Sequence, residues 1–354
     1  MNRPEVVVVG AGIIGLVSAY ELAREGRAVL VIDPTPGAGA TYAAAGMLAP
    51  GAEYVAGEDE NFQLQRSAVA RWRTLSESLE AVTGQLVTVH EVGTLLVGFD
   101  HGDRLGLTQT HDLAVAAGID VSVRRRSEHP DSFRHLNDRL TSGLFYPGEA
   151  WLDPDEAVAA LTSAISALGG AFLAARVTAT AEETQSIRLS TTEGDVEAPC
   201  ALFATGAQAP PLSLSLEHSV RPIRGVTMRC DGVDRFGLPM VRAVVRGRPF
   251  YMVGREGGHC VVGATAQEAG GDAIEVGEMR RLLTDALDVV PPLEVAAWTQ
   301  TRVGHRPVAP SGVPFFEHQT GARWAWSSGH YRHGVTLAPL AGQWAVDFVR
   351  EVVS

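Results

Sequence analysis

Three glycines near the start of the chain have the spacing of a phosphate-binding turn. Gly10, Gly12 and Gly15 follow the apolar run Val6–Val9 and precede an apolar segment with helical periodicity. Because glycine has no side chain, backbone N–H groups and a helix N-terminus can approach a pyrophosphate at such a turn. The alternative is a tight strand-to-helix turn beside an empty crevice. The order of strand, turn and helix favours a dinucleotide site.

An acidic residue ends the next predicted strand. A second β-branched run over residues 28–32 leads to Asp33, which lies eighteen positions after Gly15. A carboxylate at this point can accept hydrogen bonds from ribose hydroxyl groups and disfavours a 2′-phosphate. Nicotinamide and flavin proteins share this fingerprint, so the rest of the chain must distinguish them.

Residues 41–50 are nearly all small and apolar, and Ala44, Ala45, Gly46 and Met47 lie at their centre. Such a segment offers backbone amides and little bulk, which suits a loop laid against the pyrophosphate and the flat ring of FAD. The alternative is a loop that only packs. We expect the structureless stretch over residues 37–50 to be functional, because long irregular segments inside a compact domain usually are.

Composition excludes several function classes. The net charge of −12 and the pI near 5.4 disfavour a nucleic-acid partner, because the phosphate backbone would repel the chain. The sequence contains no lysine, so all 29 basic residues are arginine. A pyridoxal Schiff base and a Walker-type phosphate lysine are therefore both excluded.

The cysteines and the N-terminal segment bear on metal binding and location. Cys200, Cys230 and Cys260 form no CxxC pair, so we expect neither a zinc site nor a disulfide framework, and no catalytic metal. The apolar segment over residues 6–22 contains three glycines and follows Glu5, which argues against a signal peptide and a membrane span. We expect a cytoplasmic protein that does not bind membranes.

The elements that must position these residues follow from hydrophobic periodicity and turn signals. Asp153 before Pro154 predicts a helix start, and Gly169 and Gly170 predict its end. The strand over 201–204 is placed to rejoin the first sheet. The remaining predicted helices cover 60–83, 275–289 and 335–349, and the remaining strands cover 86–89, 92–99, 171–178, a hairpin around 193–195, 220–230, 240–254, 259–265 and 323–327.

At this point the residues resemble a known family, the D-amino-acid oxidase superfamily of FAD-dependent oxidoreductases, and within it the glycine oxidases of thiamine biosynthesis. The resemblance spans essentially the whole chain. It rests on the N-terminal fingerprint and on the segments Ala43–Leu48, Val261–Thr265 and Ser328–Gly334.

The resemblance implies an α/β plus α+β fold with two domains. A Rossmann-like FAD-binding domain of the GR2 type would comprise residues 1–85, 150–215 and 305–354. A substrate-binding domain built on a mainly antiparallel sheet would comprise residues 86–149 and 216–304. A homo-oligomer is also expected from the family.

The resemblance further implies FAD bound without a covalent link, since no cysteine lies in residues 306–314. The helix that starts near Gly334 would face the ring edge where reduced flavin accumulates negative charge, and Val177 would meet the adenine through its backbone. The implied cofactor-binding residues are Gly10, Gly12, Ile13, Ile14, Gly15, Asp33, Ala44, Ala45, Gly46, Met47, Val177, Thr205, Gly206, Gly329, His330, Arg332, His333, Gly334, Val335 and Thr336.

Three residues are implied in catalysis. Arg306 matches the family arginine for the substrate carboxylate, and a guanidinium can bind a carboxylate bidentately. Tyr251 matches a tyrosine whose hydroxyl assists, and Arg332 matches a second arginine near the amine. The alternatives are an interdomain ion pair for Arg306, a core tyrosine at Tyr251 and a structural role for Arg332; His330 is expected to shape the turn.

The implied reaction is oxidative deamination of a small, glycine-like amino acid. A hydride leaves Cα for flavin N5, giving an imino acid that hydrolyses to an α-keto acid and ammonia, while oxygen is reduced to hydrogen peroxide. Val308, Ala266 and His333 depart from the family pattern, which suggests a larger D-amino acid or an N-methylated amine instead. A dehydrogenase with another electron acceptor and a non-catalytic FAD-binding protein are the remaining alternatives.

Overall fold

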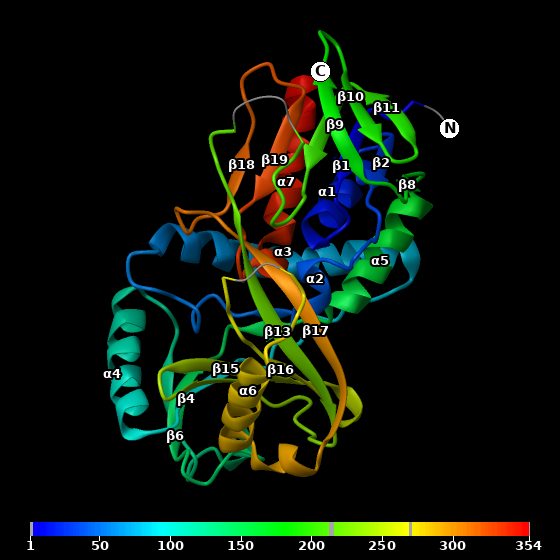
Figure 1. Ribbon diagram of the computed structural model, residues 1–354. Helices are drawn as coiled ribbons and strands as arrows, with labels where there is room; N and C mark the ends of the chain where they lie inside the picture. The colour runs from blue at the N-terminus through cyan, green and yellow to red at the C-terminus, as the bar shows by residue number, and fades with distance from the viewer. Residues whose placement is uncertain (1–2, 212–215, 269–270, 354) are drawn as a thin grey trace.

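The computed structural model describes residues 3–211, 216–268 and 271–353. Figure 1 shows two parts, each built on its own sheet, with the two long strands β13 (Arg221–Asp231) and β17 (Ala297–Val308) running between them. Some residues of the predicted domain segments lie outside the described residues. They are residues 1–2, 212–215, 269–270 and 354.

The first sheet carries the predicted dinucleotide fingerprint. Its strands are parallel except for one edge strand, Phe315–Glu317, which is antiparallel to its neighbour. All four valines of Val6–Val9 are buried, as expected for a parallel strand covered on both faces. The strand order is β18 (Phe315–Glu317), β19 (Trp324–Ser328), β12 (Cys200–Phe203), β1 (Val6–Val9), β2 (Val29–Ile32) and β8 (Ala171–Leu173).

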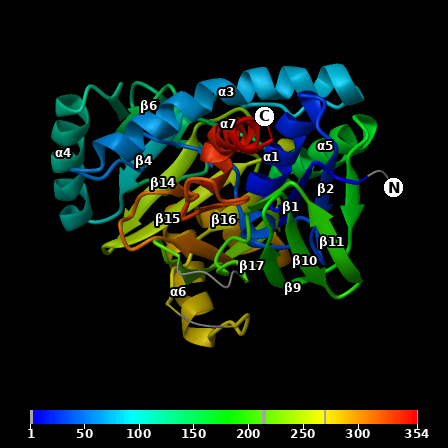
Figure 2. The same cartoon turned by 90° about the horizontal axis from the view of Figure 1, so that it is seen from above.

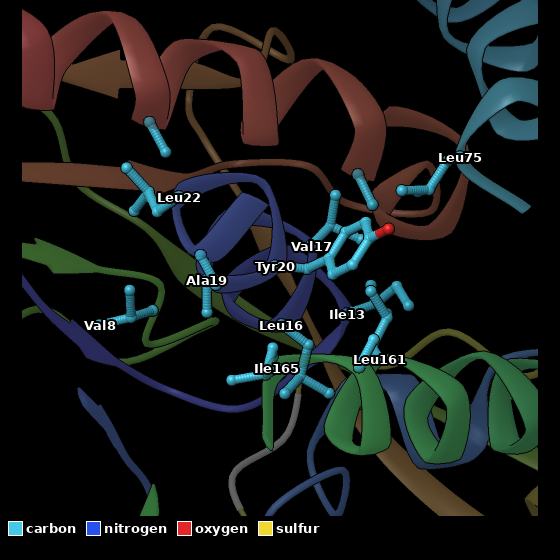
Figure 3. Close-up of a cluster of buried hydrophobic side chains, with 14 of the residues drawn as sticks. Val8, Ile13, Leu16, Val17, Ala19, Tyr20, Leu22, Leu75, Leu161 and Ile165 are labelled. Carbon is cyan, nitrogen blue, oxygen red and sulfur yellow. The ribbon is translucent and has the colours of Figure 1, made fainter. Parts of the chain in front are cut away.

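Helix α1 (Ile13–Arg24) is buried on most of its surface. It packs against α7 (Gly334–Val352) and α5 (Pro154–Ala167), while α3 (Asp59–Thr83) lies across α7 and α5. Figure 3 shows Leu16 of α1 next to Leu161 and Ile165 of α5, and Leu75 of α3 near the other face. This packing fixes the start of α1, and therefore the turn that precedes it.

The second sheet has eight strands and is antiparallel except where β14 pairs with β4, which confirms the expected mainly antiparallel sheet. Helix α4 (His101–Ala116) packs on β4 and β6, and α6 (Val276–Val289) packs on β14 and β15. The order is β17, β13, β16 (His259–Gly263), β15 (Arg248–Gly254), β14 (Met240–Val245), β4 (Thr94–Gly98), β6 (Ser142–Tyr146) and β5 (Ser122–Arg125).

Smaller elements complete the fold. Figure 2 shows α3 lying along one side of both parts of the molecule. The expected hairpin around residues 193–195 is present, with Thr191 paired to Gly194. The smaller elements are β9 (Val177–Glu182), β10 (Ile187–Thr191), β11 (Gly194–Ala198), α2 (Ala40–Ala43), β3 (Met47–Leu48), β7 (Ala150–Trp151) and the 3₁₀ turns Pro130–Phe133, Glu256–Gly258 and Pro291–Val295.

Five sequence expectations differ from the structure. Residues 86–89 form no strand, and only an isolated bridge joins His90 to Trp151. The stretch 37–50 is not structureless, because it contains α2 and β3. The predicted strand over 171–178 divides into β8 and β9. The predicted strand over 240–254 divides into β14 and β15. Strand β17 runs through residues 304 and 305, where two of the predicted domain segments meet.

None of the described helices combines the length and apolar character that crossing a bilayer requires.

Candidate active site

One cavity of ≈ 560 Å³ runs from the glycine turn to the second sheet. Its size is typical of small-molecule and cofactor sites. At one end it is lined by the turn after β1, by Asp33 and by Val177. At the other end it is lined by Tyr251 and Arg306, which come from the second sheet.

The glycine turn approaches the neighbouring strand closely. Gly10 has a φ of 108°, and a Cβ on it would lie 2.4 Å from the carbonyl oxygen of Ala204. A Cβ on Gly15 would lie 1.9 Å from the carbonyl oxygen of Gly10. The N-cap residue of α1, Gly12, has no capping side chain, and the Thr41 hydroxyl accepts from the N–H of Ile13 at 3.0 Å. Within the described residues the N–H groups of Gly12 and Ile14 have no hydrogen-bond partner. These free N–H groups at a helix start suit a pyrophosphate.

Asp33 is tied to the same turn. Its Oδ2 accepts from the N–H of Ala11 at 2.7 Å, and its Oδ1 accepts from the N–H of Thr35 at 2.7 Å. A carboxylate oxygen has more than one lone pair, so both oxygens retain capacity for ribose hydroxyl groups. The carboxylate is held in place by backbone before any ligand binds.

Helix α7 also begins at the cavity. Its N-cap residue His333 provides no side-chain cap, and within the described chain the N–H groups of Gly334, Val335 and Thr336 have no hydrogen-bond partner. The first helical bond is donated by Leu337 to the carbonyl of His333 at 2.8 Å. The free N–H groups and the helix dipole create a positive potential at this wall of the cavity.

The two predicted carboxylate-binding residues lie flat over glycines on neighbouring strands. A Cβ on Gly225 would lie 2.3 Å from the Arg306 guanidinium, and a Cβ on Gly263 would lie 2.5 Å from the Tyr251 hydroxyl. Arg306 also donates from Nη1 to the carbonyl of Thr265 at 3.0 Å. Both side chains therefore face the cavity from one face of the sheet because glycines leave room for them.

Burial affects the Tyr251 hydroxyl. It raises the pKa of Tyr251, and the nearby charges of Arg306 and Arg229 only partly oppose this effect. Tyr251 therefore stays protonated in the neutral range and can donate a hydrogen bond to a carboxylate.

Most of the residues predicted from the sequence line this cavity, and two do not. Gly15 serves the close packing of α1 on the turn, and a Cβ on Gly329 would meet Ala309 at 3.0 Å. Val308 and Ala266, which were expected to reshape the pocket, do not line it either. The predicted residues that line it are Gly10, Gly12, Ile13, Ile14, Asp33, Ala44, Ala45, Gly46, Met47, Val177, Thr205, Gly206, Tyr251, Arg306, His330, Arg332, His333, Gly334, Val335 and Thr336.

A family model described as FAD dependent oxidoreductase, the DAO family, matches residues 5–348. The chain belongs to this family. It is an FAD-dependent oxidoreductase, as the N-terminal fingerprint and residues 41–50, the alanine-rich loop, indicated.

The chain is similar to known proteins over nearly its full length. The glycine oxidase of Bacillus licheniformis is 27% identical, with 98% of this chain and 93% of that protein covered. A putative thiamine biosynthesis oxidoreductase of Rhizobium etli is 31% identical, with 96% and 94% covered. The crystal structure of glycine oxidase from Geobacillus kaustophilus has a TM-score of 0.89 at 26% identity, covering 99% of this chain and 95% of that one.

The cavity of this oxidoreductase fits FAD. The free N–H groups at the starts of α1 and α7 suit the pyrophosphate and an electron-rich ring edge, and Asp33 suits the ribose. None of the three cysteines lines the cavity, which agrees with the prediction of a non-covalent flavin. Among the described residues no cluster of three His, Cys, Asp or Glu side chains could hold a metal ion.

Glu53 is an acidic residue in the cavity wall that was not predicted from the sequence. Its carboxylate forms an ion pair with Arg242, and its Oε2 lies 3.3 Å from His333 Nδ1 and 3.8 Å from Arg332 Nε. Burial alone would raise the pKa of Glu53, but these three neighbours outweigh it and lower the pKa to about 2. Oε2 has no hydrogen-bond partner within the described residues. The only sequence signal was its position shortly after the alanine-rich loop.

A second buried carboxyl lies behind Glu53. Glu149 accepts from the N–H of Ala52 at 2.6 Å, and burial raises the pKa of Glu149 to about 7 although Ala52 and the charge of Arg242 oppose the shift. The folded protein therefore binds this proton more tightly than the unfolded chain does.

We expect Glu149 to make stability depend on pH. Its stabilising contribution is complete below the unfolded pKa of about 4.5 and is lost as pH rises through about 7, by up to about 1.4 kcal/mol per pH unit. Urea unfolding of the natural protein and of Glu149→Gln at several pH values measures this. The unfolding free energy of the natural protein should fall relative to that of Glu149→Gln as the pH rises from 5 to 7.

His330 acts in the opposite direction over part of this range, because burial and His333 lower the pKa of His330 to about 4. Its contribution rises with pH between about 4 and 6.5, but it is present in both proteins and cancels in the difference. A difference that stays constant across the range would contradict the assignment to Glu149.

Proposed function

We propose that this oxidoreductase oxidises the amine of a small amino acid to an imino acid, which hydrolyses to an α-keto acid and ammonia, with oxygen reduced to hydrogen peroxide. The observation that carries the proposal is the placement of Arg306 and Tyr251 in one cavity with the FAD-binding elements. The names of the relatives, glycine oxidases from two Bacillaceae among them, support a glycine-like substrate.

Arg306 and Tyr251 would hold the substrate carboxylate. The planar guanidinium can bind both carboxylate oxygens, and the protonated Tyr251 hydroxyl can donate a further hydrogen bond. The Gly225 and Gly263 positions fix both side chains against the sheet. This fixed placement would hold the α-carbon of the substrate in one position and orientation within the cavity.

When bound, FAD supplies the acceptor for the hydride that leaves the α-carbon. The protein's own contribution to the amine would come from Glu53, which lines the cavity and whose Oε2 has no hydrogen-bond partner among the described residues. His330 is neutral in the physiological range, because its pKa is lowered to about 4. In hydride transfer the C–H bonding electrons leave with the hydrogen and the lone pair of the neutral amine forms the C=N bond, so the step that we propose needs no dedicated general base.

The test is anaerobic mixing of the yellow protein with glycine, sarcosine, D-amino acids and N-methyl amino acids. Bleaching of the flavin band near about 450 nm by a small amino acid is the expected result. Readmitting oxygen should restore the band with one hydrogen peroxide per turnover. Bleaching without reoxidation by oxygen, but with reoxidation by a dye, would replace the oxidase with a dehydrogenase. A flavin that no amine bleaches would contradict the proposal.

A second candidate substrate is an amine that carries two carboxylates. Arg332 lines the cavity as a second cation, and its nearest carboxylate contact is the long 3.8 Å approach to Glu53. The iminodiacetate oxidase of Chelativorans sp. has a TM-score of 0.87 at 25% identity, covering 98% of this chain and 95% of that one. Iminodiacetate in the same panel separates the two candidates.

Replacing Gly225 with alanine should displace Arg306. The new methyl group would lie 2.3 Å from the guanidinium, whereas the φ of Gly225 is ordinary, so the effect reports the contact alone. We expect KM for the amino acid to rise roughly tenfold, about 1.4 kcal/mol, with the flavin spectrum unchanged. Gly106→Ala, at a glycine with open space around it, is the control. An unchanged KM in Gly225→Ala would show that Arg306 does not need this position.

The roles assigned to the individual site residues stay predictions. So do the division into an FAD-binding and a substrate-binding domain at the stated residues, the cytoplasmic location and the homo-oligomer.

A further inference from the structure

Four consecutive carbonyl groups of the alanine-rich loop are held from the second sheet. Three of the four donors are arginines, and we call Arg229, Arg255 and Arg302 the arginine cluster. The hydrogen bonds run from Arg302 to the Tyr42 carbonyl (2.9 Å), from Thr227 to the Ala43 carbonyl (3.1 Å), from Arg229 to the Ala44 carbonyl (3.2 Å) and from Arg255 to the Ala45 carbonyl (3.0 Å).

The loop separates the arginine cluster from the cavity. Residues 43–47 line the cavity, whereas none of the three arginines does. The C=O and N–H groups of a trans peptide point in opposite directions. Because the carbonyls face the arginines, the N–H groups of Ala45 and Gly46 point to the cavity side, and within the described chain neither has a hydrogen-bond partner.

One arginine of the cluster has no ion-pair partner among the described residues. Arg255 pairs with Asp153 at 2.6 Å and Arg302 pairs with Asp155 at 2.8 Å, but among the described residues no carboxylate lies within ion-pair distance of Arg229. Glu156 also acts electrostatically on Arg255, so among the described residues the positive charge of the cluster that no direct carboxylate contact neutralises is that of Arg229. Burial and the two other arginines lower the pKa of Arg229 to about 10, which still leaves it charged at neutral pH.

We propose that the arginine cluster positions the loop and supplies positive charge, and that both effects make bound FAD easier to reduce. It fixes the loop with the N–H groups of Ala45 and Gly46 toward the cavity, and it places positive charge one peptide layer behind this cavity wall. Reduction adds negative charge to the flavin, so both features stabilise the reduced form more than the oxidised form. The inference rests on the proposed placement of the flavin ring against residues 44–47.

The test is the reduction potential of bound FAD in Arg229→Gln and Arg229→Met, measured by equilibration with reference dyes. Glutamine keeps a donor for the Ala44 carbonyl but loses the charge, and methionine loses both. We expect reduced FAD to lose about tenfold more affinity than oxidised FAD in both variants, which equals about 30 mV for a two-electron couple. This measurement uses no amine, so failure of the proposed substrate would not affect it.

Arg235 provides a matched control. It is also buried, it donates to the carbonyls of Ser132 and Pro239, and burial also lowers its pKa to about 10, yet it does not line the cavity or touch the loop. Arg235→Gln should leave the potential unchanged. If Arg229 variants do not fold, Arg302→Gln tests the same cluster, because Asp155 is half exposed and tolerates the loss.

Three results would overturn the proposal. If bound FAD had the same reduction potential in Arg229→Gln as in the unsubstituted protein, the charge of Arg229 would have no effect on reduction. Equal loss of affinity for oxidised and reduced FAD would reduce the cluster to an anchor for the loop. An equal shift in Arg235→Gln would show a general effect of buried arginines.

Discussion

Replacing Arg306 with alanine is expected to lower kcat/KM for the amino-acid substrate roughly 30- to 1,000-fold. Loss of a charge-assisted, bidentate partner for the carboxylate is worth about 2–4 kcal/mol. Arg306 holds its place through Gly225 and the Thr265 carbonyl and has no ion-pair partner among the described residues, so its removal leaves none of their carboxylates unpaired. Arg306→Lys should recover only part of the loss, because an ammonium cannot bind both oxygens in one plane.

The control for this prediction is Arg221→Ala. Arg221 lies on the adjoining strand β13, but it is 57% exposed and pairs with Glu268 outside the cavity. Its removal should leave kcat/KM within about twofold. If Arg306→Ala kept natural saturation kinetics while retaining FAD, the carboxylate would bind elsewhere and the assignment would fail.

Gly10→Ala should yield a protein without bound FAD. The residue has a φ of 108°, which costs an alanine about 1–2 kcal/mol, and the new Cβ would lie 2.4 Å from the backbone oxygen of Ala204. Strands β1 and β12 or the turn must move, and the N–H groups that would receive the pyrophosphate move with them. We expect the dissociation constant for FAD to rise at least about 100-fold, about 2.7 kcal/mol, measured by fluorescence titration.

Gly26→Ala separates backbone strain from the steric contact. Gly26 also has a positive φ, 81°, but no atom lies within 4 Å of a Cβ built on it. This variant should lose about 1 kcal/mol of stability and keep its FAD. Circular dichroism should show Gly10→Ala folded. A yellow Gly10→Ala protein with natural affinity would contradict the role of the close turn.

Local sequence patterns predicted the elements around the nucleotide end well. The strand of four valines, the glycine turn and the helix α1 are contiguous in the chain, so their pattern is readable without tertiary information. The same holds for the start of α5, where the Asp153 side chain accepts from the N–H of Asp155 at 2.8 Å beside Pro154. The false strand over 86–89 has the right apolar residues but finds only a single bridge near His90. A strand needs a partner, and sequence alone does not supply one.

Residues that act through a neighbour distant in sequence were harder to predict. Glu53 became a cavity residue only because the fold brings Arg242 and His333 to it. Cys230 and Cys260 are thirty residues apart in the chain, yet they lie opposite each other on the adjacent strands β13 and β16, as free thiols. The arginine cluster draws on β13, β17 and the end of β15, and no motif links those positions.

The sequence by itself determined the cofactor class and the identity of Arg306 and Tyr251 as candidates, because those signals are residue types within short motifs. Tertiary structure alone decided which candidates face one cavity: it placed Gly225 under Arg306 and Gly263 under Tyr251, and it left Val308 and Ala266 outside. The physical reason is the packing of strands. Room for a side chain depends on the residue beside it in the sheet, and that neighbour is set by strand register rather than by sequence distance.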